Sequence, residues 1–402
     1  MNTFKTVRNW AIVQTDGFYL LFLATIAAVP AISTDMYLPA IPLLADVWGV
    51  QKSVVNLSLV LFFVAYSLFL LVLGSLSDKF GRKPILVVGI IAYIISCILC
   101  ALSFNVVFFI IVRVLQAFGC AACSAMSMAI CRDRYTGFYR QRALAYMSII
   151  ISLAPMFAPM LGVAVLKIAS WPYIFVVQGC MGLFAAGGII RYRETAEDLT
   201  TLPVHRLFTR YKVLFKNKEY MMATSTMGLL TLPFYGFIAF SPIVYLTIFH
   251  TSQPVFSYLF AANAAISMSG YFVCSKLIKR FRDISVISIA LIGCCAAGLG
   301  MLILGVQSIY FFVPAMAAYS FFCSMSRPLS NSLILEQVNT DIGAASSFLV
   351  FYQLSAGAIG MAIATYHWEV PLVTFGLMAC ITPILVLMLW PFLVKRLARK
   401  KA

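Results

Sequence analysis

The chain has 402 residues, of which 62% are hydrophobic and 10% are charged, and its net charge is +16. Soluble domains contain about 45–50% apolar and about 25% charged residues, so this composition excludes a soluble protein and predicts several helical membrane spans. The positive charge does not indicate a nucleic-acid partner, because the basic residues cluster in alternate loops between apolar segments.

Twelve apolar segments follow one another along the chain, and each is long enough to cross a hydrocarbon core about 30 Å thick. We therefore predict an all-α membrane protein with twelve transmembrane helices. An even number of spans places both termini on the same side of the membrane. The expected spans are 18–43, 53–74, 84–103, 106–130, 143–166, 172–191, 221–249, 254–276, 285–305, 308–333, 344–366 and 369–394.

The distribution of Lys and Arg predicts the orientation of these spans. Of the 29 basic residues, 25 lie in the N-terminal segment, in every second loop or in the C-terminal tail. The loops on the other side contain only Lys52 and Lys167. By the positive-inside rule, both termini are expected in the cytoplasm. The first apolar run is too long for a signal peptide, and further spans follow it.

The longest polar segment, 192–220, divides the chain into an N-terminal half (1–191) and a C-terminal half (221–402) with six predicted spans each. The sequence after the second span, at 74–80, is weakly repeated after the eighth, at 275–281. Such pseudo-symmetric halves are typical of secondary transporters, which bind their substrate between the halves. The sequence contains no P-loop, GxGxxG or catalytic triad, so we expect no enzyme.

Asp35 is the only one of the 13 acidic residues that lies well inside a predicted span. An ionisable residue there costs at least ~2.5–3.5 kcal/mol, which makes it a functional candidate by default. Arg113, in the fourth span, lies at a similar depth, so the two charges are expected to interact directly or through water. Burial favours the neutral acid and Arg113 favours the carboxylate, so Asp35 could bind and release a proton. A purely structural pair is the alternative.

Four motifs resemble those of a known family. The sequence GSLSDKFGRKP at 74–84 resembles the G-x-L-x-D-R-x-G-R-R signature of the major facilitator superfamily, at the expected place in the topology. TDMYLPAIP at 34–42 resembles the Bcr/CflA branch of drug:proton antiporters, which exports compounds such as bicyclomycin and chloramphenicol. RVLQAFG at 113–119 is similar to the R-x-x-Q-G-x-G motif of the fourth helix. APMLG at 158–162 resembles the exporter motif G-P-x-x-G, with Ala in place of the leading Gly.

This resemblance implies proton-coupled efflux of hydrophobic small molecules by alternating access. It implies a monomer in a bacterial inner membrane, driven by the proton gradient without a cofactor. It also implies a latch on the cytoplasmic side, in which Arg82 pairs with Asp133 and Asp78 faces the start of the eleventh helix near Gly343. A plain polar loop is the alternative. The implied latch comprises Gly74, Asp78, Gly81, Arg82 and Asp133.

The fifth span carries small residues and prolines at regular spacing. Ala154, Ala158 and Gly162 recur every four residues, which lets two helices approach closely. Pro155 and Pro159 each remove a backbone hydrogen bond and bend the helix. We predict that this helix packs closely against the other half of the protein.

A pocket for amphiphilic substrates should be apolar and aromatic with few polar groups. Each candidate has an alternative role in packing or against lipid. The candidates are Asp35, Tyr37, Asn56, Phe63, Gln116, Met156, Pro233, Tyr235, Asn263, Phe322 and Gln353.

Three features leave alternatives open. Arg327, in the tenth span, has a structural or snorkelling role or else a gating role. The pairs Cys97/Cys100 and Cys120/Cys123 have zinc-like spacing but no nearby His or carboxylate, so we predict packing and no metal. For the substrate, the alternatives are a single exported metabolite or siderophore, or an imported nutrient or metal.

Overall fold

The computed structural model describes residues 17–196, 199, 211–338 and 342–401. These residues form helices and connecting loops without a strand, so the predicted all-helical fold is confirmed. The N-terminal helices are α2 (Gly17–Asp35), α3 (Ile41–Trp48), α4 (Lys52–Phe80), α5 (Arg82–Ala101), α6 (Val106–Arg134), α7 (Gly137–Ile168) and α8 (Pro172–Arg191). The C-terminal helices are α10 (Lys218–Gly228), α11 (Thr231–Pro242), α12 (Gln253–Leu277), α13 (Asp283–Gly300), α14 (Ile309–Leu335), α15 (Ile342–Thr365) and α16 (Pro371–Lys401).

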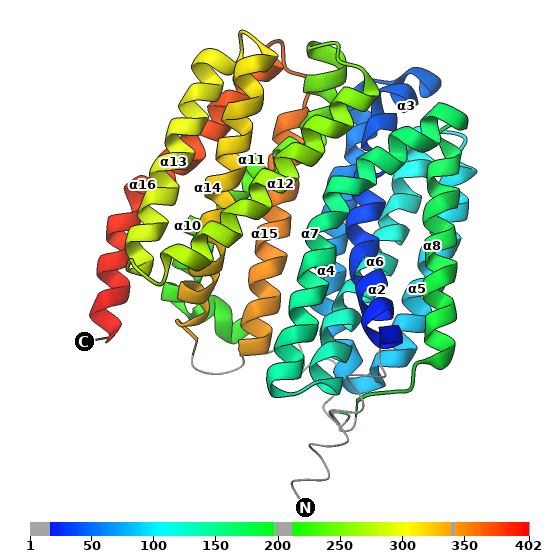
Figure 1. Ribbon diagram of the computed structural model, residues 1–402, viewed down its shortest axis with the longest axis horizontal. Coiled ribbons are helices and arrows are strands. Elements are labelled where there is room, and N and C mark those ends of the chain that lie inside the picture. Colours follow the sequence, from blue (N-terminus) through cyan, green and yellow to red (C-terminus); the bar gives the residue numbers. More distant parts are fainter. Residues whose placement is uncertain (1–16, 197–198, 200–210, 339–341, 402) are drawn as a thin grey trace, which may run out of the picture.

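The helices form two groups that stand side by side (Figure 1). In the first group α6 packs against α4 and α5, α5 packs against α8, and α2 packs against α7. In the second group α14 packs against α12 and α13, α13 packs against α16, and α11 packs against α15. The same pairing therefore occurs twice, as expected for a six-plus-six repeat. The boundaries 1–191, 192–220 and 221–402 stay a prediction, because much of the middle segment lies outside the described residues.

Two helix pairs join the groups: α4 packs against α15, and α7 packs against α12. The predicted packing of the fifth span against the other half is thus present. A hydrogen bond of 3.1 Å between the hydroxyls of Ser67 and Ser355 also links α4 to α15. At the end of the bundle opposite the basic loops, the Lys52 ammonium donates to the Thr247 hydroxyl at 3.0 Å.

Within the described residues, eleven helical stretches are long and apolar enough to cross a membrane. The remaining long helix, α12, occupies the place of the eighth predicted span but is richer in polar residues. Its Asn263 and Ser267 line a cavity between the two groups, so part of its polar character faces the protein interior. The seventh span consists of α10, α11 and the π-helical turn Ile243–Ile248.

The first span is interrupted at the acidic motif. The helix α2 ends at Asp35, a turn follows at Met36 and Tyr37, and a short 3-10 turn (Leu38–Ala40) leads into α3. Prolines at 39 and 42 favour this interruption, since neither can donate a backbone hydrogen bond to a continuous helix. Asp35 thus lies at the point where a transmembrane helix breaks.

The helix ends that carry Arg82, Arg132 and Arg191 lie at one end of the bundle, which we call the basic face. The helix α2 starts and α16 ends at this face (Figure 1). Residues 211–216 are helical, and their side chains touch both groups of helices. The Tyr211 hydroxyl donates to the Leu71 carbonyl at 3.2 Å, and the Phe215 ring packs 5.0 Å from that of Phe348.

Candidate functional site

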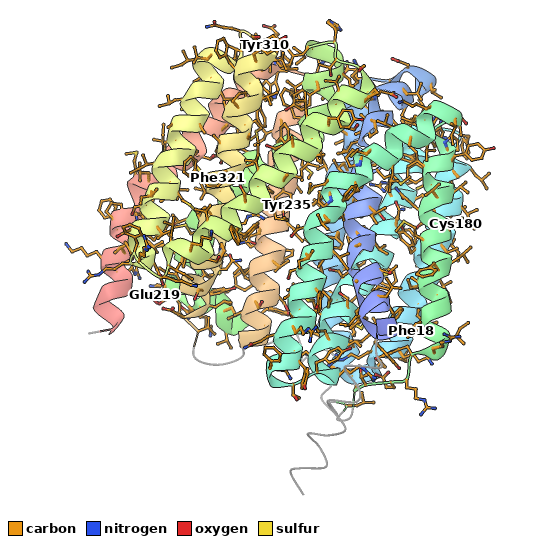
Figure 2. All side chains as sticks on the ribbon, viewed as in Figure 1. Phe18, Cys180, Glu219, Tyr235, Tyr310 and Phe321 are labelled. Carbon is orange, nitrogen blue, oxygen red and sulfur yellow. The ribbon has the colours of Figure 1, made fainter. Side chains whose placement is uncertain are left out.

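A cavity of about 370 Å³ lies between the two groups of helices, and we call it the central cavity. The first group lines it from α2, α4, α6 and α7, and the second from α11, α12, α14 and α15. Tyr235, on α11, lies near the middle of the molecule where the two groups meet (Figure 2). Aromatic side chains form much of the wall, including Phe62, Phe63, Tyr66, Phe234, Tyr235, Phe237, Phe260 and Tyr271.

Among the described residues that line the central cavity, Asp35 is the only carboxylate. Its side chain is buried, with 4% of the residue exposed. One carboxylate oxygen accepts a hydrogen bond of 2.9 Å from the Thr34 hydroxyl. A buried acid beside a cavity can exchange its proton with the cavity contents, which is the geometry that a proton carrier needs.

Of the two arrangements expected for Asp35 and Arg113, directly or through water, the direct ion pair is absent among the described residues. Arg113 is fully buried, and it donates to the Ser33 carbonyl at 3.0 Å and to the Gln116 side chain. Its guanidinium lies 4.4 Å from the centre of the Tyr37 ring. The two residues occupy similar depths but different sides of α2, since Asp35 faces the cavity and Arg113 approaches from α6. Arg113 thus holds the backbone of α2 next to Asp35 rather than the carboxylate itself.

A polar network surrounds Arg113 inside the N-terminal half. Gln116 donates to Gln178 at 2.9 Å, and Gln178 donates to the Ile32 carbonyl at 3.4 Å. Two atoms of the guanidinium, Nε and Nη2, have no hydrogen-bond partner, but the Phe62 ring lies 4.6 Å from its carbon. Cation–π contacts of this kind offset part of the cost of burying a charge.

The central cavity collects only some of the predicted pocket residues. Asp35, Phe63, Tyr235 and Asn263 line it, together with Arg327, so snorkelling of Arg327 to the membrane surface is wrong. Tyr37 turns away after the helix break, and its hydroxyl lies 3.0 Å from that of Ser58. The other predicted pocket residues are not among those that line the cavity: Asn56, Gln116, Met156, Pro233, Phe322 and Gln353.

The residues of the implied latch meet at the basic face. The Arg82 guanidinium donates to Asp133 at 2.8 Å and to Asp78 at 2.7 Å. A second cavity, of about 680 Å³, is lined by Gly74, Asp78 and Arg82 from the first group and by Gly343 from the second. Asp78 and the start of α15 therefore share a cavity, but the Asp78 carboxylate bonds to Arg82. This second cavity adjoins the central cavity, because Tyr66 and Ser124 line both.

We expect the Arg82→Gln variant to lower the melting temperature of the purified protein. Arg82 is 7% exposed at its side chain, and its removal leaves two carboxylates without their partner. Because the Asp78 side chain is 38% exposed and solvent screens its charge, we expect a cost between about 1 kcal/mol, as for an exposed pair, and about 3 kcal/mol, as for a buried one. The control is Arg132→Gln, because the Arg132 side chain is 58% exposed and lies 3.9 Å from Asp133. Equal melting temperatures for the two variants would contradict a structural role for the Arg82 cluster.

Sequence reasoning missed Glu194, which caps the start of α5. Its carboxylate accepts from the backbone N–H groups of Arg82 at 3.1 Å and Lys83 at 2.9 Å, and from those of Thr195 and Ala196. Gly81 has a φ of +93°, and a Cβ there would come within 2.7 Å of the Glu194 carboxylate. This contact explains the need for glycine at that position.

Burial raises the pKa of Glu194, but its backbone donors lower it by more, so the pKa lies below its usual value. A depressed pKa contributes stability above the unfolded value of about 4.3, and this contribution disappears as the pH falls through the folded pKa. We therefore expect the Glu194→Gln variant to have a lower melting temperature than wild type at neutral pH. The difference in melting temperature should shrink below about pH 4. Melting curves over this pH range, with the exposed Glu369→Gln as control, test the prediction; a pH-independent difference would contradict it.

Gly162, one of the small residues of α7, faces its own half. A Cβ at Gly162 would collide with the Met36 carbonyl oxygen and would lie 3.2 Å from Pro39. Ala154 and Ala158 are buried on the same helix. The sequence predicts that this motif forms the contact with the other half. At Gly162 this prediction is wrong, because Gly162 packs α7 against the break in the first span.

The four cysteines of the two CxxC pairs are buried and unpaired. In the described residues, no group of three or more His, Cys, Asp or Glu side chains could hold a metal ion. This is in keeping with the prediction of a packing role.

Two similarly paired groups of membrane helices, with an aromatic cavity and a buried acid between them, are the architecture of a secondary transporter. The sequence profile of the Major Facilitator Superfamily matches residues 22–361, and the chain belongs to this family.

The chain is 29% identical over 345 residues to the MFS-type transporter YdgK of Bacillus subtilis, covering 84% of this chain and 86% of YdgK. It is 26% identical over 367 residues to a bicyclomycin resistance protein homolog of Haemophilus influenzae, covering 89% of this chain and 91% of that protein. The fold also matches the crystal structure of the nucleoside transporter NupG, with a TM-score of 0.74 and 11% identity over 94% of this chain and 99% of that one.

Proposed function

We propose that this transporter exports hydrophobic small molecules, such as bicyclomycin or chloramphenicol, in exchange for protons. The single observation that carries the proposal is Asp35, the one carboxylate that the described part of the chain contributes to the wall of the central cavity. An aromatic cavity suits apolar ligands, and one buried acid gives it a group that a proton can occupy. The relation to a bicyclomycin resistance protein homolog supports this choice of substrate.

In this mechanism, Asp35 binds the proton and Arg113 positions Asp35 through the Ser33 carbonyl. Proton and substrate favour different facing states, so binding of one promotes release of the other. The cluster of Asp78, Arg82 and Asp133 latches the basic face shut in one of these states. By the positive-inside rule the basic face is cytoplasmic, in a bacterial inner membrane.

A panel of antibiotic susceptibilities in a pump-deficient bacterial host tests the proposal. We expect expression of the protein to raise the inhibitory concentration of several hydrophobic compounds. A shift for one compound only would indicate a dedicated exporter. No shift for any compound, with the protein present in the membrane, would contradict drug efflux and favour export of a metabolite or import of a nutrient.

A further inference from the structure

Arg327 places a positive charge in the wall of the central cavity, on α14. Its Nε and Nη2 atoms are buried and have no hydrogen-bond partner. No carboxylate forms an ion pair with it among the described residues. Two unbonded N–H groups on a buried guanidinium without a counter-ion are costly, and a ligand that supplies a negative charge and hydrogen-bond acceptors would remove that cost.

The surroundings of Arg327 leave Nε and Nη2, two neighbouring donors on one edge of the guanidinium, available, while Tyr271 and Cys323 lie beside the rest of it. The guanidinium carbon lies 4.3 Å from the centre of the Phe234 ring and 5.3 Å from that of the Tyr235 ring. Cation–π contacts of this kind engage the face of the guanidinium, whereas its N–H groups point outward in its plane. Two neighbouring N–H donors in one plane match the two oxygens of a carboxylate.

Asp35 does not neutralise this charge, although it lines the same cavity. Asp35 ends α2, which rises from the basic face, whereas Arg327 lies in the last third of α14, which runs back towards that face. The acid and the base therefore occupy opposite ends of the cavity along the helix axes. The side-chain oxygen of Asn263, which lines the same cavity, also lacks a partner and can accept a hydrogen bond from a ligand.

We propose that Arg327 forms a carboxylate-binding subsite in the central cavity, so that the transporter accepts amphiphilic molecules with an aromatic body and a free carboxylate. This inference rests on the proposed transport function and narrows its substrate class. The aromatic wall contacts the apolar body, Arg327 binds the carboxylate, and Asn263 accepts from a donor on the same molecule. Asp35 remains free for the proton or for a cationic group of a zwitterion.

Two dyes that differ in one group test this subsite on the full-length protein in lipid nanodiscs. Rhodamine B carries a cationic ring system and a free carboxylate, and rhodamine B ethyl ester carries the same body with the carboxylate blocked. We expect wild type to bind the acid more tightly than the ester by roughly tenfold, measured by fluorescence anisotropy. Arg327→Gln should abolish this preference by weakening acid binding and leaving ester binding unchanged.

Two further variants make the result specific. Arg327→Lys keeps the positive charge but lacks the planar pair of N–H donors, so it should retain only part of the preference for the acid over the ester. This variant provides the test if Arg327→Gln aggregates. Lys167→Gln removes an exposed cation outside the cavity and should bind both dyes like wild type.

Three outcomes would overturn the subsite. These are tighter binding of the ester by wild type, an equal loss of both dyes in the Arg327 variants, and no saturable binding of the acid. Because binding is measured without transport, the subsite and the proposed function can fail separately. Preserved dye preference with no proton-coupled transport would reject only the function.

Discussion

The Asp35→Asn variant is expected to bind substrate like wild type but to lose substrate-induced proton movement by roughly tenfold or more. Asparagine has the shape of aspartate, and its side-chain oxygen can still accept the hydrogen bond that Thr34 donates at 2.9 Å. The amide cannot take up or release a proton at physiological pH. Binding should therefore survive while coupling is lost. Proteoliposomes that contain a pH-sensitive dye, together with a separate binding assay, measure the two properties independently.

Asp46→Asn is the matched control for this experiment. Asp46 lies on α3, ten residues or so further along the same span, but it is exposed and does not line the central cavity. We expect it to couple protons like wild type. If Asp35→Asn folds, binds substrate and still exchanges protons as wild type does, then Asp35 is structural and the proposed mechanism is wrong, although the fold stands.

The sequence predicted the helices well because their signal is local. A run of apolar residues long enough to cross the membrane identifies a span without knowledge of its neighbours. The motif at 74–84 also lay where the topology required, and the structure places its Arg82 against Asp133. Among the described helices, composition describes α12 poorly, because Asn263 lines the cavity and Ser257 and Ser267 are buried.

The candidate site was harder to predict because position along a helix gives depth but not direction. Asp35 and Arg113 lie at similar depths, yet Asp35 faces the cavity and Arg113 binds the Ser33 carbonyl from α6. Tyr37 lies two residues beyond Asp35 but packs inside the N-terminal half, since the helix breaks between them. Glu194 accepts a hydrogen bond from Arg82 at the start of α5, 112 positions away in the sequence, and no local pattern predicts that contact.

The same helix break makes Gly162 the position where one added methyl group should destabilise the folded protein most. The backbone of α7 touches the Met36 carbonyl there, directly after Asp35. A Gly-to-Ala change inside a helix normally stabilises it by up to about 1 kcal/mol. At Gly162 the added methyl would have to push α7 away from the first span, and overpacking of this kind costs about 1–3 kcal/mol. We therefore expect Gly162→Ala to lower the melting temperature in spite of its helix propensity.

Gly187→Ala on α8 supplies the comparison, because a Cβ at Gly187 meets nothing within 4 Å. That variant should melt at or above the wild-type temperature and transport normally. Gly162→Ala should also reduce proton-coupled transport by roughly tenfold, since displacement of α7 moves the backbone that presents Asp35 to the cavity. If both variants melted and transported alike, α2 and α7 could separate at no cost. Close packing at Gly162 would then play no part in positioning the acid.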